Sequence, residues 1–196
     1  MSGRSRRRAL GQHFLVDSGV AARIIALAGL APGTSVLEIG PGQGALTGPL
    51  LRAGHPVVGI EIDSSLAAAL RRREEPSLEV LEGDFLTLDA GRRRDLPRHV
   101  VANLPYSTGT AILERLLESP GRVERIVVML QREVADRLCA APGSRTYGAL
   151  TVLTALHARV RHGFHVPPEA FRPPPQVESS VIRLDVEAEP RVAIGD

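Results

Sequence analysis

The chain has 196 residues with a formal net charge of +2, and its 43% hydrophobic and 23% charged residues are typical of a globular domain. Its one cysteine, Cys139, excludes an internal disulfide and a cysteine-based zinc site. All 24 basic residues are arginine, which excludes a Walker-type phosphate loop, Schiff-base catalysis and a lysine general base.

The chain begins with a basic arm, residues 1 to 10, in which Arg4, Arg6, Arg7 and Arg8 come before any acidic residue. The apolar core of a signal peptide does not follow this arm. No stretch of the sequence approaches the ~20 apolar residues that a membrane helix needs. We therefore expect a soluble, cytoplasmic protein that does not bind membranes.

Five short runs of Val, Ile and Leu predict buried strands, because each is bounded by Gly, Pro or charged residues. They are residues 35–40, 56–62, 78–83, 98–104 and 125–130. Helical spacing of apolar residues predicts helices over 63–75 and 107–118, with the N-cap among the first two residues of each. This alternation favours a mostly parallel sheet covered by helices on both faces.

Beyond residue 131 the pattern predicts two more helices, over 132–143 and 146–158, and then two strands, over 158–166 and 179–186. Only a short proline-rich stretch separates the two strands, so no helical crossover can join them. We therefore expect them to form an antiparallel hairpin at one edge of the sheet. The last residues, 187–196, are expected to form a polar tail.

The glycine-rich stretch over residues 37–47 follows the first strong strand and opens a helix, which is where doubly wound folds bind ligands. Gly40 and Gly42 allow a tight turn and a close approach of a ligand to the backbone. With Ala45 as third member they partly satisfy the dinucleotide fingerprint, and Glu61 lies about 20 residues further on. These residues by themselves keep a nicotinamide-dependent dehydrogenase open as an interpretation.

Two further features favour a different adenosyl ligand. The glycines follow an E-x-G-x-G-x-G spacing that begins at Glu38 and contains Pro41, and the third strand ends in Gly83-Asp84. Acids after the second and third strands are suited to hold the ribose diol and the exocyclic amine of one adenosine. A dehydrogenase has no need of GDFL (83–86) followed by NLPY (103–106).

Several motifs occur in the order expected of one family. They are GQHFL (11–15), VLEIGPGQGALT (36–47), EID (61–63), GDFL (83–86), NLPY (103–106), MLQREVADRL (129–138), YGALTVL (147–153) and FRPPPQVESSVIRL (171–184). The chain resembles the ribosomal RNA adenine N6-dimethyltransferases of the kasugamycin-sensitivity type, from about residue 8 to residue 186. The resemblance implies a Rossmann-like class I methyltransferase fold with a mostly parallel seven-stranded sheet.

The family resemblance also implies a function and a domain organisation. Its bacterial members use S-adenosyl-L-methionine to dimethylate two adjacent adenines near the 3′ end of small-subunit ribosomal RNA. We expect a catalytic domain over residues 1–186, no metal, and a monomer with ribosomal RNA as its partner. Family members usually continue into a small helical domain, which we expect this chain to lack.

The resemblance places the cofactor against six residues. Glu61 is implied in binding the ribose, Asp84 in binding the cofactor adenine, and Leu15 in contacting the cofactor through its backbone. His13 stands where many members carry asparagine. The six positions are His13, Leu15, Gly40, Glu61, Asp84 and Asn103.

The stretch Asn103-Leu104-Pro105-Tyr106 has a physical rationale as the catalytic corner. An adenine N6 amine is a poor nucleophile because its lone pair is delocalised into the ring. If the Asn103 side-chain oxygen and the Leu104 carbonyl accept its two hydrogens, the lone pair turns toward the methyl sulfonium while Tyr106 stacks on the base. No strong base is needed, because the methylated ammonium loses its proton to water. Catalysis is then mostly positioning and electrostatics.

Other features of the sequence leave alternatives open. Phe171 is expected against the second face of the flipped adenine, or else as a core anchor. The arm arginines are expected to bind RNA phosphates, or else to form a tail without a role. The arginine runs at 71–73 and 92–94 are further candidates for binding RNA, although such runs are more often solvated helix or loop faces. A macrolide-resistance-type methyltransferase of large-subunit ribosomal RNA and a non-catalytic assembly factor that binds ribosomal RNA remain alternatives, as does monomethylation.

Overall fold

The computed structural model describes residues 13–89, 95–118 and 121–189. The helices are α2 (Ser18–Ala28), α3 (Thr47–Arg52), α4 (Ser64–Arg71), α5 (Gly109–Leu117), α6 (Arg132–Leu138), α7 (Ala149–His157) and the short 3₁₀ helix η2 (Pro168–Ala170). The strands are β1 (Phe14–Leu15), β2 (Val36–Ile39), β3 (Val57–Glu61), β4 (Leu78–Glu82), β5 (His99–Asn103), β6 (Arg125–Gln131), β7 (Ala158–Val166), β8 (Phe171–Arg172) and β9 (Ser179–Val186).

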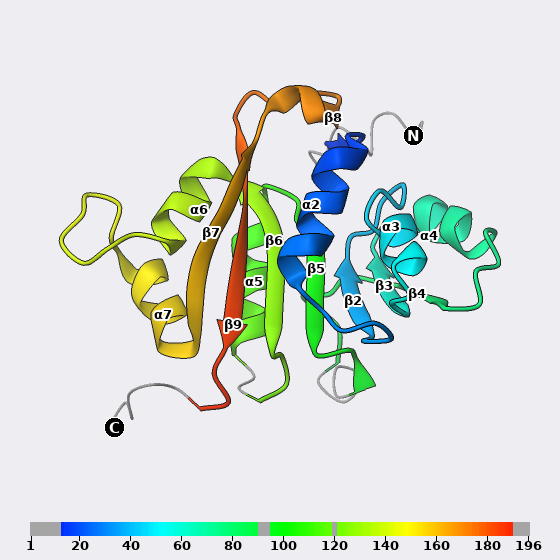
Figure 1. Ribbon diagram of the computed structural model, residues 1–196, viewed down its shortest axis with the longest axis horizontal. Coiled ribbons are helices and arrows are strands. Elements are labelled where there is room, and N and C mark those ends of the chain that lie inside the picture. Colours follow the sequence, from blue (N-terminus) through cyan, green and yellow to red (C-terminus); the bar gives the residue numbers. More distant parts are fainter. Residues whose placement is uncertain (1–12, 90–94, 119–120, 190–196) are drawn as a thin grey trace.

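Seven of the strands form one sheet in the order β4-β3-β2-β5-β6-β9-β7 (Figure 1). The strands from β4 to β6 run parallel, whereas β9 pairs antiparallel with both β6 and β7. The prediction of a mostly parallel seven-stranded sheet with an antiparallel hairpin at its edge is therefore confirmed. From β2 the chain moves outward to β3 and β4 and then returns to β5 on the other side of β2. This reversal of strand order places a crevice at the carboxyl ends of β2 and β5.

Both faces of the sheet are buried beneath helices, as the near-continuous apolar strands predicted. Along β6, Ile126, Val128 and Leu130 belong to the core cluster beneath α5, and Val127 and Met129 belong to the cluster beneath α2. Figure 1 shows α2 in front of the sheet and α5 behind it. The alternation gives each face its own core and holds the strand ends in fixed positions.

The predicted strands are found within one residue of their expected bounds, and the predicted helices are found too, but α4 ends at Arg71 rather than at residue 75 and α6 at Leu138 rather than at residue 143. Asp63 caps α4 as predicted, since its side chain accepts hydrogen bonds from the backbone N–H groups of Ser65 and Leu66. Helix α2 was not predicted, although its sequence carries both end signals. Asp17 accepts N–H bonds at its start, and Gly29 ends it with a left-handed φ of 56°.

A two-stranded sheet formed by β1 and β8 was also not predicted. Leu15 pairs with Phe171 and Phe14 with Arg172, and the N–H of Val16 donates to the carbonyl of Ala170 at 2.8 Å. This pairing brings the start of the described chain to the proline-rich stretch. Two strands of two residues each leave no periodic signal in the sequence.

Some expectations concern residues that the structure does not describe. The arm arginines, the arginine run at 92–94 and residues 190–196 of the tail lie outside the described ranges. Within those ranges, none of the helices is long and apolar enough to cross a membrane. The domain limits, the monomeric state and the cytoplasmic location stay predictions.

Gly163 provides a test of the packing between β7 and its neighbours. It lies at a bulge in β7, and a Cβ added there would lie 2.9 Å from the carbonyl oxygen of Val181 and 2.6 Å from Cδ2 of Leu27. Backbone cannot yield as a side chain can, so we expect Gly163→Ala to lower the free energy of unfolding by about 1–3 kcal/mol. Urea unfolding monitored by circular dichroism measures the change.

Gly48→Ala is the matched control for this substitution. The nearest atom to its Cβ is the end of the flexible Arg52 side chain at 3.3 Å, and alanine favours the helix α3. We expect this variant to be as stable as the wild type or slightly more stable. An unfolding free energy of Gly163→Ala equal to that of Gly48→Ala would contradict the packing argument.

Candidate active site

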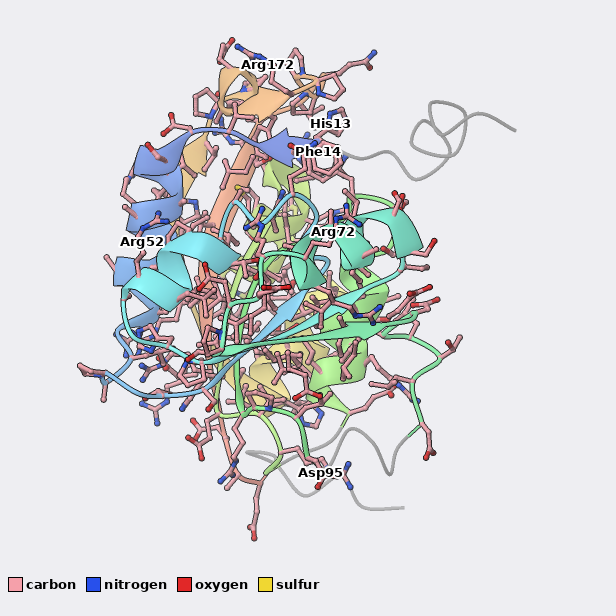
Figure 2. All side chains as sticks on the ribbon, turned by 90° about the vertical axis from the view of Figure 1, so that its right-hand side faces the viewer. His13, Phe14, Arg52, Arg72, Asp95 and Arg172 are labelled. Atoms are coloured by element: carbon pink, nitrogen blue, oxygen red, sulfur yellow. The ribbon has the colours of Figure 1, made fainter. Side chains whose placement is uncertain are left out.

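The structure brings all ten predicted cofactor and catalytic residues around one pocket at the carboxyl ends of the central strands. They come from both sides of the reversal in strand order, where doubly wound folds bind ligands. They are His13, Leu15, Gly40, Glu61, Asp84, Asn103, Leu104, Pro105, Tyr106 and Phe171. Figure 2 shows His13 and Phe14 close to Arg172 at one end of the molecule, with Asp95 at the opposite end.

The glycine-rich loop between β2 and α3 forms one wall of the pocket. Gly42 adopts a left-handed φ of 57°, which a residue with a side chain rarely adopts. A Cβ on Gly42 would also lie 3.3 Å from the Phe14 ring, so the glycine lets that ring approach the loop. Pro41 packs against β3 at Gly59, where a Cβ would lie only 3.2 Å from the proline Cγ. The loop is therefore held between β1 and β3.

Arg73 supports the same loop from outside the pocket. Its Nη2 donates to the Gln43 carbonyl at 2.6 Å, and a Cβ on Gly44 would lie 2.5 Å from its Nη1. Arg71, from the same run, donates to the carbonyl of Val80 at 3.0 and 3.2 Å. Both arginines are exposed, as predicted for a solvated run, but they also bind backbone groups. Sequence reasoning missed this role because the partner of Arg73 lies 30 residues away.

Glu61 lies at the end of β3, and the backbone fixes its carboxylate beside the pocket. Its Oε2 accepts the N–H of Gly42 at 2.8 Å, and its Oε1 accepts the N–H of Asp63 at 2.9 Å. The side chain is only 2% exposed, and this burial raises the pKa of Glu61 although the N–H bonds oppose the effect. Each oxygen keeps a further lone pair, so the carboxylate can accept hydrogen bonds from a pair of hydroxyl groups.

Glu38, in β2, is a second buried acid at the pocket, and it was not among the predicted cofactor residues. It lies beneath the glycine loop and accepts a hydrogen bond from Thr47 Oγ1 at 2.6 Å. Burial, reinforced by the neighbouring Glu61 and opposed by the Thr47 bond, raises the pKa of Glu38 to about 7. Its place at the start of the glycine spacing was the signal that singled it out in the sequence.

Asp84 follows β4 and lines the pocket from a local turn. Its Oδ1 accepts the N–H of Leu86 at 2.9 Å, which is an Asx-type turn that orients the carboxylate. The N–H of Gly83 donates to the carbonyl of Glu61 at 2.9 Å. The ends of β3 and β4 are thereby joined, and the two predicted adenosine-binding acids lie at the ends of adjacent strands, Glu61 as the last residue of β3 and Asp84 just after β4.

The corner Asn103-Leu104-Pro105-Tyr106 forms the opposite wall. Asn103 is the last residue of β5, and its Nδ2 donates to the His13 carbonyl at 3.4 Å, so the amide oxygen remains as an acceptor. Pro105 closes the corner, because its carbonyl accepts the N–H groups of Thr108 and Gly109 where α5 begins. The corner is rigid because it lies between a central strand and a helix.

The aromatic ring of Tyr106 is held from two sides. Its hydroxyl lies 2.5 Å from Ser179 Oγ, and burial raises the pKa of the Tyr106 phenol. The His13 ring lies against it with centroids 5.5 Å apart and planes tilted by 32°. His13 is itself fixed, because its Nδ1–H donates to the Pro173 carbonyl at 2.8 Å. The two rings border the pocket together.

Phe171 lies in the core rather than on the surface. Its side chain is 1% exposed, because pairing of β8 with β1 directs it into the cluster beneath α2. It also borders the pocket. The structure thus shows Phe171 as a core anchor at the pocket wall, and its contact with an incoming base stays a prediction.

A sequence profile described as ribosomal RNA adenine dimethylase matches residues 3–194. The chain belongs to this family. Two relatives named ribosomal RNA small subunit methyltransferase A, from Magnetococcus marinus and Geobacter sulfurreducens, are each 45% identical. The alignments cover 99% and 97% of this chain and 71% of each relative.

Solved structures of two methyltransferases superpose on this chain, which agrees with its membership of the dimethylase family. A dimethyladenosine transferase from Plasmodium falciparum superposes with a TM-score of 0.81 at 30% identity, covering 89% of this chain and 64% of that chain. The 23S rRNA methyltransferase ErmE gives a TM-score of 0.79 at 34% identity, covering 91% of this chain and 72% of its own. The predicted family and the predicted class I methyltransferase fold are confirmed.

The raised pKa of Glu38 predicts a dependence of stability on pH. Its pKa of about 7 in the folded protein lies above the ordinary value of 4.5, so folding takes up a proton between these values. The stabilisation is complete below about pH 4.5 and is lost as the pH rises through about 7. We expect the wild type to lose more unfolding free energy than Glu38→Gln between about pH 5 and about pH 8.

Urea unfolding at several pH values measures this difference. Glu79→Gln, which removes an exposed acid from β4, is the control and should keep the pH dependence of the wild type. Equal pH dependence in Glu38→Gln and wild type would show that Glu38 ionises normally in the folded protein.

Proposed function

We propose that this chain is an S-adenosyl-L-methionine-dependent adenine N6-dimethyltransferase of ribosomal RNA, acting on two adjacent adenines near the 3′ end of the small-subunit RNA. The observation that carries the proposal is the meeting of two acids, Glu61 and Asp84, with the Asn103–Tyr106 corner around one pocket. The acids suit an adenosyl cofactor, and the corner suits an adenine substrate. Membership of the dimethylase family supports the same reaction.

The pocket fits S-adenosyl-L-methionine on its own chemistry. At Gly40 a Cβ would meet no atom within 4 Å, so this open space lets a ligand reach the backbone, and Glu61 presents a fixed carboxylate to a ribose diol. Asp84 offers an acceptor for the exocyclic amine of the cofactor adenine, and His13, Leu15, Gly40 and Asn103 line the remaining walls. When bound, the cofactor supplies an electrophilic methyl group on a sulfonium.

The chain's own contribution to the reaction is to hold the target amine. The Asn103 amide oxygen and the Leu104 carbonyl accept the two N6 hydrogens, which draws the nitrogen toward tetrahedral geometry and makes its lone pair available to the methyl sulfonium. Tyr106 stacks on the base, a contact worth roughly 1–3 kcal/mol. The proton of the methylated ammonium leaves to water, so no side chain with a raised basicity is needed. Positioning and electrostatics supply the rate.

The substrate proposal depends on the relatives. Those at about 45% identity are named small subunit methyltransferases, whereas ErmE, a 23S rRNA methyltransferase, is 34% identical. The small-subunit target is therefore favoured over the large-subunit alternative. The arm arginines Arg4, Arg6, Arg7 and Arg8 are proposed to neutralise RNA phosphates beside the pocket.

Transfer of labelled methyl groups to purified ribosomal RNA tests this function. Labelled adenine recovered from the small-subunit RNA as N6,N6-dimethyladenine is the expected product. Binding of RNA without transfer would favour the non-catalytic assembly factor, and label in the large-subunit RNA would favour the macrolide-resistance type.

Asp84→Ala is expected to weaken the binding of S-adenosyl-L-methionine by about 10- to 100-fold, which is the usual effect of losing a hydrogen bond to a charged acceptor. Isothermal titration calorimetry measures the affinity. Asp89→Ala is the matched control, because Asp89 is an exposed acid in the following loop, and it should bind as the wild type does. If the two variants bind S-adenosyl-L-methionine equally well, Asp84 does not take part in binding the cofactor.

Asn103→Ala is expected to keep the fold and to lower the rate of methyl transfer by about 10²–10³-fold, since a preorganised polar contact at the reacting group is lost. Single-turnover transfer to ribosomal RNA measures the rate. Gln131→Ala removes an amide from the end of the neighbouring strand β6 and should retain wild-type activity. Near wild-type turnover in Asn103→Ala would refute the role given to the amide.

A further inference from the structure

The hydroxyl of Tyr106 has one hydrogen-bond partner on the far side of the pocket wall. Ser179 Oγ lies 2.5 Å from the tyrosine oxygen, although 73 residues separate the two in the chain. Ser179 is fully buried and Tyr106 is partly buried. A buried hydroxyl without a partner is costly, so this bond stabilises one arrangement of both side chains.

Ser179 is an anchor that the sheet holds on both sides. It is the first residue of β9, where its Cα pairs with that of Gln131 in β6 and that of Val166 in β7. Strand β6 is in turn paired with β5, which ends at Asn103. The backbone of Ser179 therefore has a fixed position relative to the strand that carries the amide proposed to hold the target amine.

The geometry of a tyrosine explains what such a bond can do. The phenol oxygen lies on the axis about which the ring rotates, so a hydrogen bond there fixes the direction of the axis and leaves the rotation free. The rotation is limited instead by the neighbouring His13 ring, whose centroid lies 5.5 Å away with its plane tilted by 32°. Ser179 and His13 together determine where the ring lies and which way it faces.

We propose that Ser179 is a positioning residue that aims the Tyr106 ring at the incoming adenine, an inference that rests on the proposed function. Ser179 acts through Tyr106 and is not itself a lining residue of the pocket. Without its hydroxyl, the ring axis is free to swing away from the stacking position. The stacked base is then held less often in the reactive arrangement, while the cofactor side of the pocket is unchanged.

The chain offers a matched control on the same strand. Ser180 is also fully buried, and its hydroxyl has a hydrogen bond to His165 Nδ1 at 2.8 Å. It belongs to neither wall of the pocket. Ser180→Ala thus removes a buried hydroxyl and one hydrogen bond from the neighbouring residue of β9 without touching Tyr106.

A double-mutant cycle tests the inference. We expect Ser179→Ala to lower kcat/KM for small-subunit ribosomal RNA by about 3- to 10-fold, the usual effect of one neutral hydrogen bond. The affinity of Ser179→Ala for S-adenosyl-L-methionine should stay within about twofold of the wild-type affinity. The kcat/KM of the control Ser180→Ala should also stay within about twofold of the wild-type value. Tyr106→Phe should lose as much activity as Ser179→Ala, and the variant with both substitutions should lose no more. If the fold losses in kcat/KM of the two single variants multiply in the double variant, the two residues act independently and the proposal is overturned. A wild-type kcat/KM in Ser179→Ala would overturn it as well.

An optical titration tests the contact without methyl transfer. The chain has two tyrosines, Tyr106 and Tyr147, and no tryptophan, so in Tyr147→Phe the ultraviolet titration reports Tyr106 alone. The Ser179 bond lowers the pKa of the Tyr106 phenol, so adding Ser179→Ala should raise it, and Ser180→Ala should not. An unchanged titration would overturn the inference. Absence of methyl transfer by the wild type, with the expected titration, would instead overturn the proposed function.

Discussion

The pocket depends on the buried carboxylate of Glu61, which is stable only when both of its oxygens accept hydrogen bonds. Glu61 is almost inaccessible to water, and an unpartnered charge in that place would be strongly unfavourable. Its two oxygens accept the N–H groups of Gly42 and Asp63, and its own carbonyl accepts that of Gly83. One residue thereby joins the glycine loop, the start of α4 and the end of β4. The shape of the wall formed by the glycine-rich loop therefore depends on the hydrogen bonds of this one side chain.

The opposite wall is organised by a different constraint. Pro105 ends β5 and starts the turn into α5, so the backbone presents its carbonyls and the Tyr106 ring in a fixed direction. The ring is then held by Ser179 from the antiparallel strand β9 and by His13 from the start of the described chain. The antiparallel hairpin at the sheet edge therefore has a part in the site, because β9 lies directly beside β6.

Both walls meet at the point where the strand order reverses between β2 and β5. A parallel sheet brings the carboxyl ends of all its strands to one edge, and the reversal leaves a crevice there. The ten predicted site residues gather at this edge although they are spread from residue 13 to residue 171. The family resemblance identified these residues, and the topology explains why residues so distant in sequence form one pocket.

The sequence by itself determined the central strands, the helices between them and a cap of α4 at Asp63 or Ser64, because periodicity and turn residues are local signals. Its motifs identified the ten predicted site residues through the family resemblance. Only the tertiary structure decided the pairing of β1 with β8, the burial of Phe171, the support of the loop by Arg73 and the bond between Tyr106 and Ser179. Each of these joins segments far apart in the chain. Their partners are chosen by which strand ends become neighbours, and no local pattern of residues contains that information.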